Sequence, residues 1–191
     1  RVLFRSGRGP WDAQKSSANT MDLRGKILRI KPLPDDSYIC PAGNLFNQNA
    51  ITLQWGSPES KQMTTNSRQQ SGRPEIYVMG CRNPYRISID DRRKLLFWGE
   101  VGPDAGEPDS TRGPAGHDEV NRARAAGFFG WPYFVGNNKP YRKYNFASQE
   151  SGSPFDPLHP INNSPNNTGS RELPPAEPAF IWYPYGNSPE F

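Results

Sequence analysis

The feature that most constrains this fold is the lack of any sustained helical period in the positions of its apolar residues. The best helical candidate, HDEVNRARAAG at 117–127, is short, and its charged residues leave no clean apolar face. Short apolar runs bounded by turn residues recur instead, as in EIYVMG at 75–80, YRISID at 85–90 and KLLFWGEV at 94–101. The 21 prolines and 18 glycines of the 191-residue chain fit many turns and long ordered loops. The pattern predicts an all-β protein, and long loops between strands favour a propeller over a sandwich or a barrel.

Two more strands are expected on either side of this central region. Apolar and basic residues alternate in LRGKILRIKP at 23–32, as in a half-buried strand, and PAFIWYPY at 178–185 reads as a last strand. The polar stretch 54–73 has no period and is expected to be an inserted loop. The segment 136–178 is rich in Asn, Pro, Ser and Gly but keeps its aromatics, which indicates an ordered surface excursion.

Composition and charge exclude several classes of protein. Aromatic residues make up 12% of the chain, which argues against disorder. The net charge of +4 is spread out, so we expect no nucleic-acid partner. No run approaches the roughly 20 apolar residues of a membrane span. Cys40 and Cys81 could pair in an oxidising compartment, but two unpaired thiols are the favoured expectation.

Both ends of the chain look truncated, so we expect a fragment. RVLFRS at 1–6 matches one reading frame of the end of a common sequencing adapter, and we expect these residues to be a non-native segment. A short native strand around Val2-Leu3-Phe4 is the alternative. The domain would then occupy residues 7–191, which stop just after an aromatic run.

GCRNPYRISID at 80–90 places three unusual residues between two strands. Pro84 fixes its own φ and has no N–H, so it belongs at the start of a strand and not within a central ladder. The residue before a proline is restricted to extended geometry, and Gly80 permits a sharp exit from the preceding strand. Arg82 and Asn83 are therefore expected on a rigid corner, where a guanidinium and a carboxamide can face a ligand.

Four segments in this order resemble the glucose/sorbosone dehydrogenase family. They are RGKILRI, GCRNPYRISID, LLFWGEVGPDA and HDEVNRARAAGFFGWP, and the resemblance covers roughly residues 22–135. The resemblance implies a six-bladed β-propeller that binds pyrroloquinoline quinone (PQQ) and calcium (Ca2+). Residues 7–191 would then be a partial propeller of an exported protein, extracellular or periplasmic, with further domains in its parent. The remainder of the chain is similar to a subgroup found in large secreted bacterial proteins.

The resemblance also assigns candidate site residues. Arg82 and Asn83 would contact the quinone and stabilise negative charge developing on its reduced form. The backbone carbonyls of Gly102 and Pro103 would hold the calcium that bridges to the cofactor. Glu100 adds acidic charge nearby but is not assigned as a ligand.

A second calcium site is implied at Asp118, Glu119 and the carbonyl of Phe129, although this site varies among relatives. The GWP motif is more simply architectural, with Trp131 packing between blades. The alternative for the corner is that Arg82 pairs with a local carboxylate while the neighbouring asparagine caps a turn.

No catalytic residue is expected in this chain. In the family a histidine acts as the general base on the sugar hydroxyl, and its segment would precede residue 1 here. His117 and His159 are the only histidines and neither matches it; His117 is expected on the surface or in a loop.

Three functions remain open. The first is a sugar dehydrogenase that oxidises an aldose hydroxyl and passes electrons to a cytochrome or another acceptor. The second is a non-catalytic secreted propeller that binds carbohydrate or protein with the same loops. The third is a structural module of a multidomain protein, because fold alone does not settle function.

Overall fold

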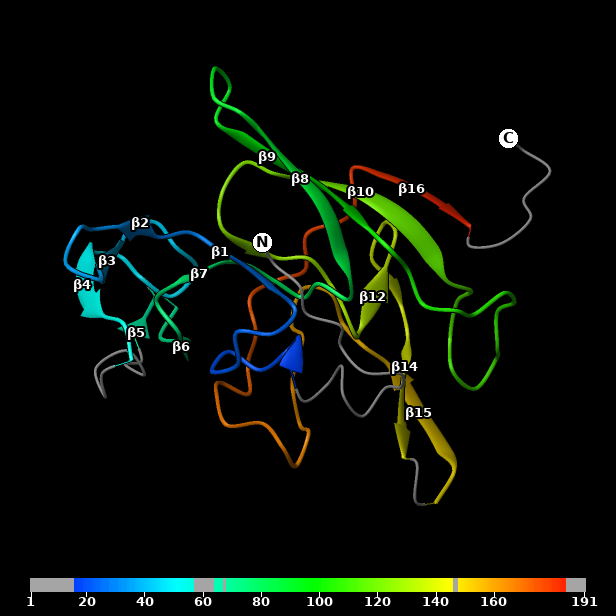
Figure 1. Ribbon diagram of the computed structural model, residues 1–191. Coiled ribbons are helices and arrows are strands. Elements are labelled where there is room, and N and C mark those ends of the chain that lie inside the picture. The colour runs from blue at the N-terminus through cyan, green and yellow to red at the C-terminus, as the bar shows by residue number, and fades with distance from the viewer. Residues whose placement is uncertain (1–15, 57–63, 67, 146–147, 185–191) are drawn as a thin grey trace.

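The computed structural model describes residues 16–56, 64–66, 68–145 and 148–184 (Figure 1). The described residues contain no helix; their strands gather into small sheets, so the predicted all-β class is confirmed. These sheets do not close on themselves within the described part of the chain, as expected for part of a propeller. The non-native segment expected at 1–6 lies outside the described residues.

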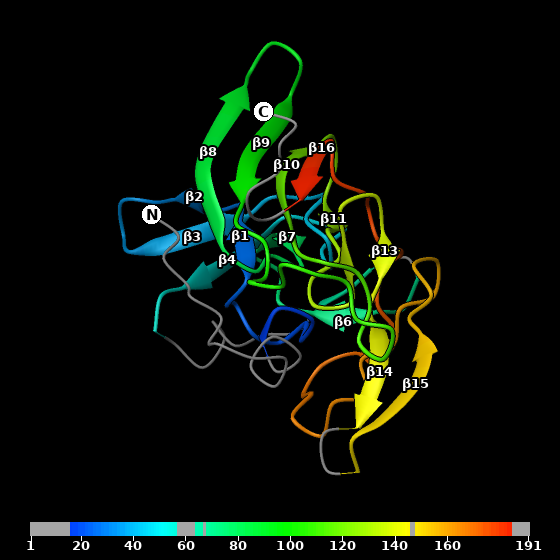
Figure 2. The ribbon, with the colours of Figure 1, turned by 90° about the vertical axis from the view of Figure 1, so that its right-hand side faces the viewer.

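The largest sheet has four antiparallel strands, the unit from which a propeller blade is made. Its strands are β8 (Pro84–Asp90), β9 (Leu95–Glu100), β10 (His117–Ala123) and β16 (Ile181–Pro184), in the spatial order β16-β10-β9-β8. β8, β9 and β16 were expected from the sequence, whereas β10 lies in the segment that was considered only as a helical candidate and rejected. Figures 1 and 2 show the β8–β9 hairpin projecting from one end of the molecule.

A mixed three-stranded sheet lies against this large sheet. It consists of β1 (Lys26–Leu28), β7 (Ile76–Met79) and β11 (Gly127–Phe128), with β7 in the middle. The two sheets share a buried cluster in which Trp98 and Ala123 of the large sheet meet Ile27, Val78 and Phe129. This cluster fixes the ends of β7 and β9, between which the predicted corner is held.

A separate group of small sheets carries the segment after β1. It comprises β2 (Lys31–Pro32), β3 (Ser37–Cys40) and β4 (Ile51–Gln54), followed by the pair β5 (Thr64–Thr65) and β6 (Ser71–Gly72). Tyr38, Cys40 and Leu53 form its buried cluster. The sequence predicted no strand between residues 33 and 50, so β3 was missed.

The surface excursion expected at 136–178 forms regular structure in its described residues. β12 (Phe134–Val135) leads into it, and it contains β13 (Lys139–Pro140), β14 (Arg142–Asn145) and β15 (Glu150–Pro154). The β14–β15 hairpin projects from the end of the molecule opposite the β8–β9 hairpin in both views (Figures 1 and 2). Tyr133, Phe134 and Phe155 anchor the excursion to a second core cluster.

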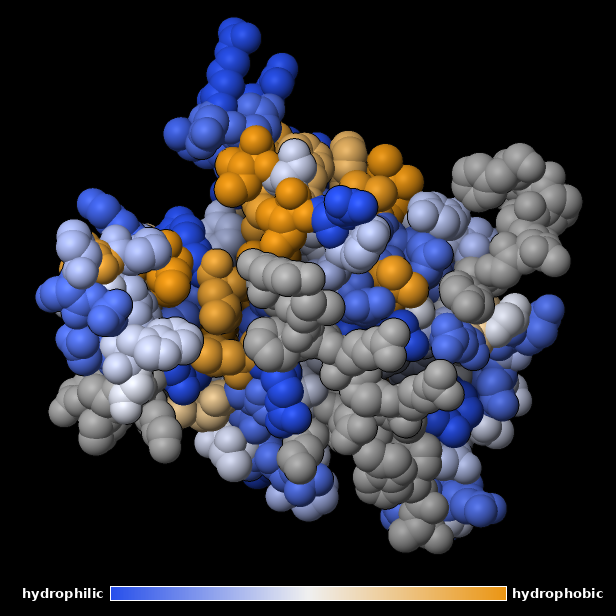
Figure 3. Space-filling view, in the orientation of Figure 1, coloured by the Kyte–Doolittle hydropathy of each residue, from blue (hydrophilic) through white to orange (hydrophobic). Residues whose placement is uncertain are grey.

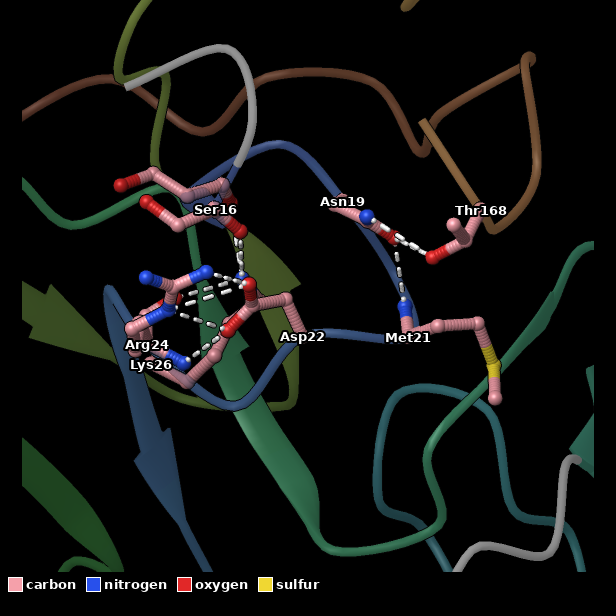
Figure 4. A network of polar contacts seen from close by, with 8 residues as sticks. Ser16, Asn19, Met21, Asp22, Arg24, Lys26 and Thr168 are labelled. Carbon is pink, nitrogen blue, oxygen red and sulfur yellow. Dashed lines mark hydrogen bonds and ion pairs between the residues drawn. The ribbon is translucent and has the colours of Figure 1, made fainter. Parts of the chain in front are cut away.

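The segment expected as one strand at 23–32 is broken into β1 and β2, and one of its basic residues is not exposed. Lys26 is fully buried, and its Nζ donates to the carbonyl oxygens of Ser16 (2.8 Å), Ser17 (3.0 Å) and Arg24 (2.9 Å) (Figure 4). The prediction of alternating exposed basic residues was wrong here, because three carbonyls replace water around the ammonium group.

Several apolar side chains of β8 remain exposed. Tyr85, Ile87 and Ile89 project from this edge strand, and Figure 3 shows apolar residues gathered over this part of the molecule. No helix among the described residues is long and apolar enough to cross a membrane.

Candidate functional site

The corner between β7 and β8 requires glycine at its first position. Gly80 has a φ of +79°, and a Cβ there would lie 2.5 Å from Cε2 of Phe128. Any side chain would therefore combine an unfavourable backbone conformation with a clash. Pro84 is the first residue of β8, as its missing N–H predicted.

The end of β9 holds the two residues that were expected to face a ligand. The Asn83 N–H donates to Oε1 of Glu100, and the Val101 N–H donates to the Asn83 carbonyl at 3.2 Å. Nη1 of the Arg82 guanidinium donates a hydrogen bond of 3.1 Å to the Val101 carbonyl. Arg82 and Asn83 are thus clamped to two consecutive residues of the neighbouring strand.

Glu100 belongs to a pair of buried carboxyl groups. It lies directly opposite Glu119 in the register of β9 and β10, and both side chains are buried. Burial raises the pKa of Glu100 to about 8, and the charge of Glu119 adds to the rise. Burial likewise raises the pKa of Glu119. Glu100 therefore holds a proton at neutral pH, since two buried like charges at this spacing are unfavourable.

Glu119 is held by contacts of its own. Its Oε1 accepts a bond of 2.6 Å from the Gly136 N–H, and its Oε2 accepts one of 3.0 Å from Nδ2 of Asn121. The Oδ1 of Asn121 is buried and has no hydrogen-bond partner among the described residues. The buried face of β10 is therefore unusually polar for a strand in the middle of a sheet.

Aromatic side chains line the other side of Arg82. The guanidinium carbon lies 5.7 Å from the centre of the Trp131 ring, and Tyr141 meets the same ring edge-on at 6.2 Å. Burial raises the pKa of Tyr141, and the nearby charge of Glu119 raises it further. Within the described part of the chain, the buried Trp131 Nε1–H and Tyr141 hydroxyl lack hydrogen-bond partners. Two donors without acceptors thus lie in the same aromatic group as Arg82.

The proposed ligands of the cofactor calcium lie in the loop after β9. The Gly102 N–H donates to Oδ1 of Asp118 at 2.8 Å, and a Cβ on Gly102 would fall 2.0 Å from the His117 carbonyl. The Pro103 carbonyl accepts one bond of 2.8 Å, from the Ala105 N–H. A carbonyl oxygen has two lone pairs, so this loop can still offer a hard oxygen to a cation.

The three residues of the implied second calcium site are not gathered equally. Asp118 and Glu119 are consecutive on β10, so their side chains leave the strand on opposite faces. Asp118 reaches the loop after β9, whereas Glu119 lies on the buried face. Phe129 is buried beside β7 and donates its N–H to Met79 O at 2.8 Å. In the described residues, no group of three or more His, Cys, Asp or Glu side chains could hold a metal ion.

The structure contradicts the expected position of one histidine and confirms that the two cysteines are unpaired. His117 is buried at the start of β10, so its expected surface position was wrong; its Nε2 lies 3.0 Å from the Lys139 ammonium. His159 is exposed and contacts Asp156 at 3.1 Å. Cys40 and Cys81 are both buried and free, which confirms the favoured expectation.

Glu100 is the site residue that sequence reasoning left unassigned. Its signal was present in the alternation of β9, because Trp98 and Glu100 share the buried face of that strand. A carboxyl group on the buried face of a strand needs hydrogen-bond donors. Here a donor comes from the corner that precedes the neighbouring strand β8.

These features define a β-sheet protein with a polar, partly buried corner between two strands. The family profile described as glucose/sorbosone dehydrogenase matches residues 55–170, more than half of the chain. The chain belongs to the glucose/sorbosone dehydrogenase family.

Individual relatives are distant and much longer. The chain is 25% identical to the HIPL2 protein of Arabidopsis thaliana over 174 residues, which are 91% of this chain and 20% of that protein. It is also 25% identical to the HIPL1 protein of Arabidopsis thaliana over 162 residues, 83% of this chain and 20% of that protein. A crystal structure of a glucose dehydrogenase aligns over 81% of this chain and 38% of that chain, with 14% identity and a TM-score of 0.31. The chain thus spans about a fifth of the length of the curated relatives it matches.

Proposed function

We propose that this chain carries part of the cofactor site of a sugar dehydrogenase that uses PQQ and calcium. The observation that supports the proposal most is the clamped corner, in which Arg82 and Asn83 are fixed by Glu100 and Val101. Hydrogen-bond donors that are fixed before the ligand binds stabilise negative charge that develops on it more effectively than mobile donors do.

The donor set of the corner fits PQQ, which is a planar, oxygen-rich anion. A guanidinium presents a flat fork of N–H groups that matches carboxylate and quinone oxygens. The buried N–H of Trp131 and hydroxyl of Tyr141 lack acceptors among the described residues, and both side chains belong to the aromatic group beside Arg82. When bound, the quinone supplies the two-electron acceptor; Arg82 and Asn83 orient it and favour its more negative, reduced form.

Calcium fits the loop after β9 in the same proposal. The carbonyls of Gly102 and Pro103 are hard oxygen donors, and the bond from Gly102 N–H to Asp118 fixes the loop that carries them. The second calcium implied at Asp118, Glu119 and the carbonyl of Phe129 is left out of the proposal, because the two carboxylates leave β10 on opposite faces.

The substrate in this proposal is an aldose, and the electrons pass to a cytochrome or another external acceptor. The general base is proposed to lie outside this chain. His117 is unsuited to that role, because it is buried and its Nε2 lies 3.0 Å from the Lys139 ammonium. Burial also lowers the pKa of His117. We propose an extracellular or periplasmic location for the intact protein.

The test is a titration of the intact protein with PQQ, with and without calcium, followed by the absorption of the cofactor. Arg82→Ala should weaken binding by about 10- to 100-fold, because hydrogen bonds to charged groups contribute roughly 1.5–3 kcal/mol. Arg122→Ala is the matched control. The guanidinium carbon of Arg122 lies 4.0 Å from the centre of the Phe180 ring, on the face of β10 opposite to Glu119. The affinity of this variant should stay within about twofold of the wild type.

The absence of saturable binding at every calcium concentration would refute the proposal. The corner would then be inherited scaffold, and the search would turn to carbohydrate or protein ligands of a non-catalytic propeller. A PQQ affinity that changes neither with calcium nor with Arg82→Ala would also count against the proposal, because the cofactor would then bind away from the corner.

A further inference from the structure

We propose that Glu100 is a positioning residue, which fixes the backbone of Arg82 and Asn83 so that their side chains meet the ligand. The inference rests on the proposed function for the identity of that ligand, but its structural part can be tested without it. It assigns a role to a buried carboxyl group that would otherwise only add a desolvation cost.

The first step of the argument is the contact between Glu100 and the corner. The Asn83 N–H donates to Glu100 Oε1, and the Arg82 N–H also interacts with this carboxyl group. These N–H groups lie between β7 and β8, just after the turn at Gly80, whose φ is +79°. The carboxyl group of Glu100 thus takes the place of a strand partner at the point where the ladder is interrupted.

The second step is that Glu100 is itself immobilised. The indole N–H of Trp98 donates to its Oε2 at 3.3 Å, and Trp98 is only 1% exposed. The Trp98 ring packs edge-on against Phe129, with ring centres 4.7 Å apart. The carboxyl group is therefore held from the core side, and its position cannot adapt if the corner moves.

The third step separates positioning from a general contribution to packing. Glu100 contacts the corner through acceptor oxygens at a defined reach, so the effect should depend on an acceptor at that reach and not on negative charge. Glu100→Gln keeps one acceptor at the same distance, Glu100→Asp keeps the carboxyl group but is shorter, and Glu100→Ala removes the group altogether. Because Glu100→Asp also leaves space unfilled, Glu100→Met is the variant that separates the two roles: it fills similar space without an acceptor, so a residue needed only for packing would tolerate it.

The experiment measures two quantities in the intact protein, the exchange rate of the Asn83 amide hydrogen and the affinity for PQQ in the presence of calcium. Glu100→Ala, Glu100→Asp and Glu100→Met should accelerate the exchange and weaken PQQ binding by about tenfold or more, because each leaves the Asn83 N–H without its acceptor. Glu100→Gln should stay within about threefold of the wild type in both measurements.

The matched control is Glu75→Gln. Glu75 is another buried glutamate, and it accepts a bond of 2.8 Å from the Tyr38 hydroxyl and pairs with Arg73 at 2.6 Å, away from the corner. This variant tests whether loss of a buried carboxylate anywhere in the chain is sufficient. It should leave the Asn83 exchange rate and the PQQ affinity unchanged within about twofold.

The outcomes distinguish this inference from the proposed function. If the wild-type protein does not bind PQQ but Glu100→Ala and Glu100→Asp accelerate Asn83 exchange, the cofactor proposal fails and the positioning role stands. Unchanged exchange and affinity in the aspartate variant would overturn the positioning role. Equal losses in Glu100→Gln and Glu100→Asp would overturn it as well, and this comparison remains available if Glu100→Ala does not fold.

Discussion

Two antiparallel sheets of this chain bury opposite kinds of side chain. The β3–β4 pair buries Tyr38, Cys40 and Leu53, which form a compact cluster of their own. The middle strand β10 of the large sheet buries Glu119 and Asn121 on the face toward the corner. Both sheets have the same pairing geometry, so the difference lies in what their buried faces contact.

The difference indicates which region is scaffold and which is site. Burial of polar groups is unfavourable unless hydrogen bonds replace those lost with water. The apolar face of β3–β4 needs no such partners, whereas the polar face of β10 depends on the loops and on β9 for its contacts. The polar face of β10 therefore belongs with the corner proposed to bind the ligand, and the apolar face of β3–β4 belongs with the scaffold.

Trp98→Ala should give the largest effect, because Trp98 belongs both to the core and to the contacts of Glu100. The expected loss in the free energy of unfolding is about 3–5 kcal/mol, the usual cost of a large buried aromatic, and PQQ binding should weaken as well. Urea denaturation of the intact protein measures the first effect and cofactor absorption the second. Trp98→Phe keeps most of the ring but loses the bond to Glu100, so it should cost less stability; a loss below about 1 kcal/mol for the alanine variant would contradict this account.

Leu53→Ala should separate the two regions. Leu53 is 2% exposed, and its truncation should cost about 2–5 kcal/mol in the free energy of unfolding. PQQ affinity, measured under conditions where the variant is folded, should stay within about twofold of the wild type because the cluster does not touch the corner. A large loss of affinity would show that the small sheet is coupled to the site.

Gly80→Ala should cost less than either core truncation but should act on the corner directly. Two penalties combine, the positive φ and the contact with Phe128, and together we expect about 2–3 kcal/mol. Gly56→Ala isolates the first penalty, because Gly56 has a φ of +76° and nothing lies within 4 Å of its added Cβ. The same cost in both variants, measured by urea denaturation, would mean that the close approach to Phe128 is unimportant.

The last effect is confined to alkaline pH and arises in the β3–β4 cluster. Burial raises the pKa of the Cys40 thiol from 9.0 to about 12. The folded state keeps this proton after the unfolded state has lost it, so the contribution is complete below pH 9.0 and is lost as the pH rises toward 12. Denaturation series at several pH values should show a flatter alkaline decline for Cys40→Ala than for the wild type, and equal slopes would contradict the assignment.

The sequence predicted the corner better than its surroundings, because the corner depends on local chemistry. Pro84 marks the start of β8 through its missing N–H, and Gly80 marks the exit from β7 through its positive φ. These are properties of single residues and can be read without knowledge of the fold.

What was missed depends on partners that are distant in the sequence. β3 and β4 lie in stretches with weak apolar patterns and are stabilised by pairing with each other. His117 is buried because β10 lies in the middle of a sheet, and the role of Glu100 follows from the register of β8, β9 and β10. No local pattern contains a register between strands, so these features required the structure.

The carbonyl cage around Lys26 has a consequence for how the start of the described chain is organised. Three backbone carbonyls that converge on one positive centre resemble the coordination of a monovalent metal ion. Here the ion is attached to the chain through the lysine stem, so it is supplied in a fixed one-to-one ratio and cannot diffuse away. Burial lowers the pKa of Lys26 to about 7, so this cation is governed by the pH and not by the ionic composition of the surroundings, unlike the calcium proposed for the loop after β9.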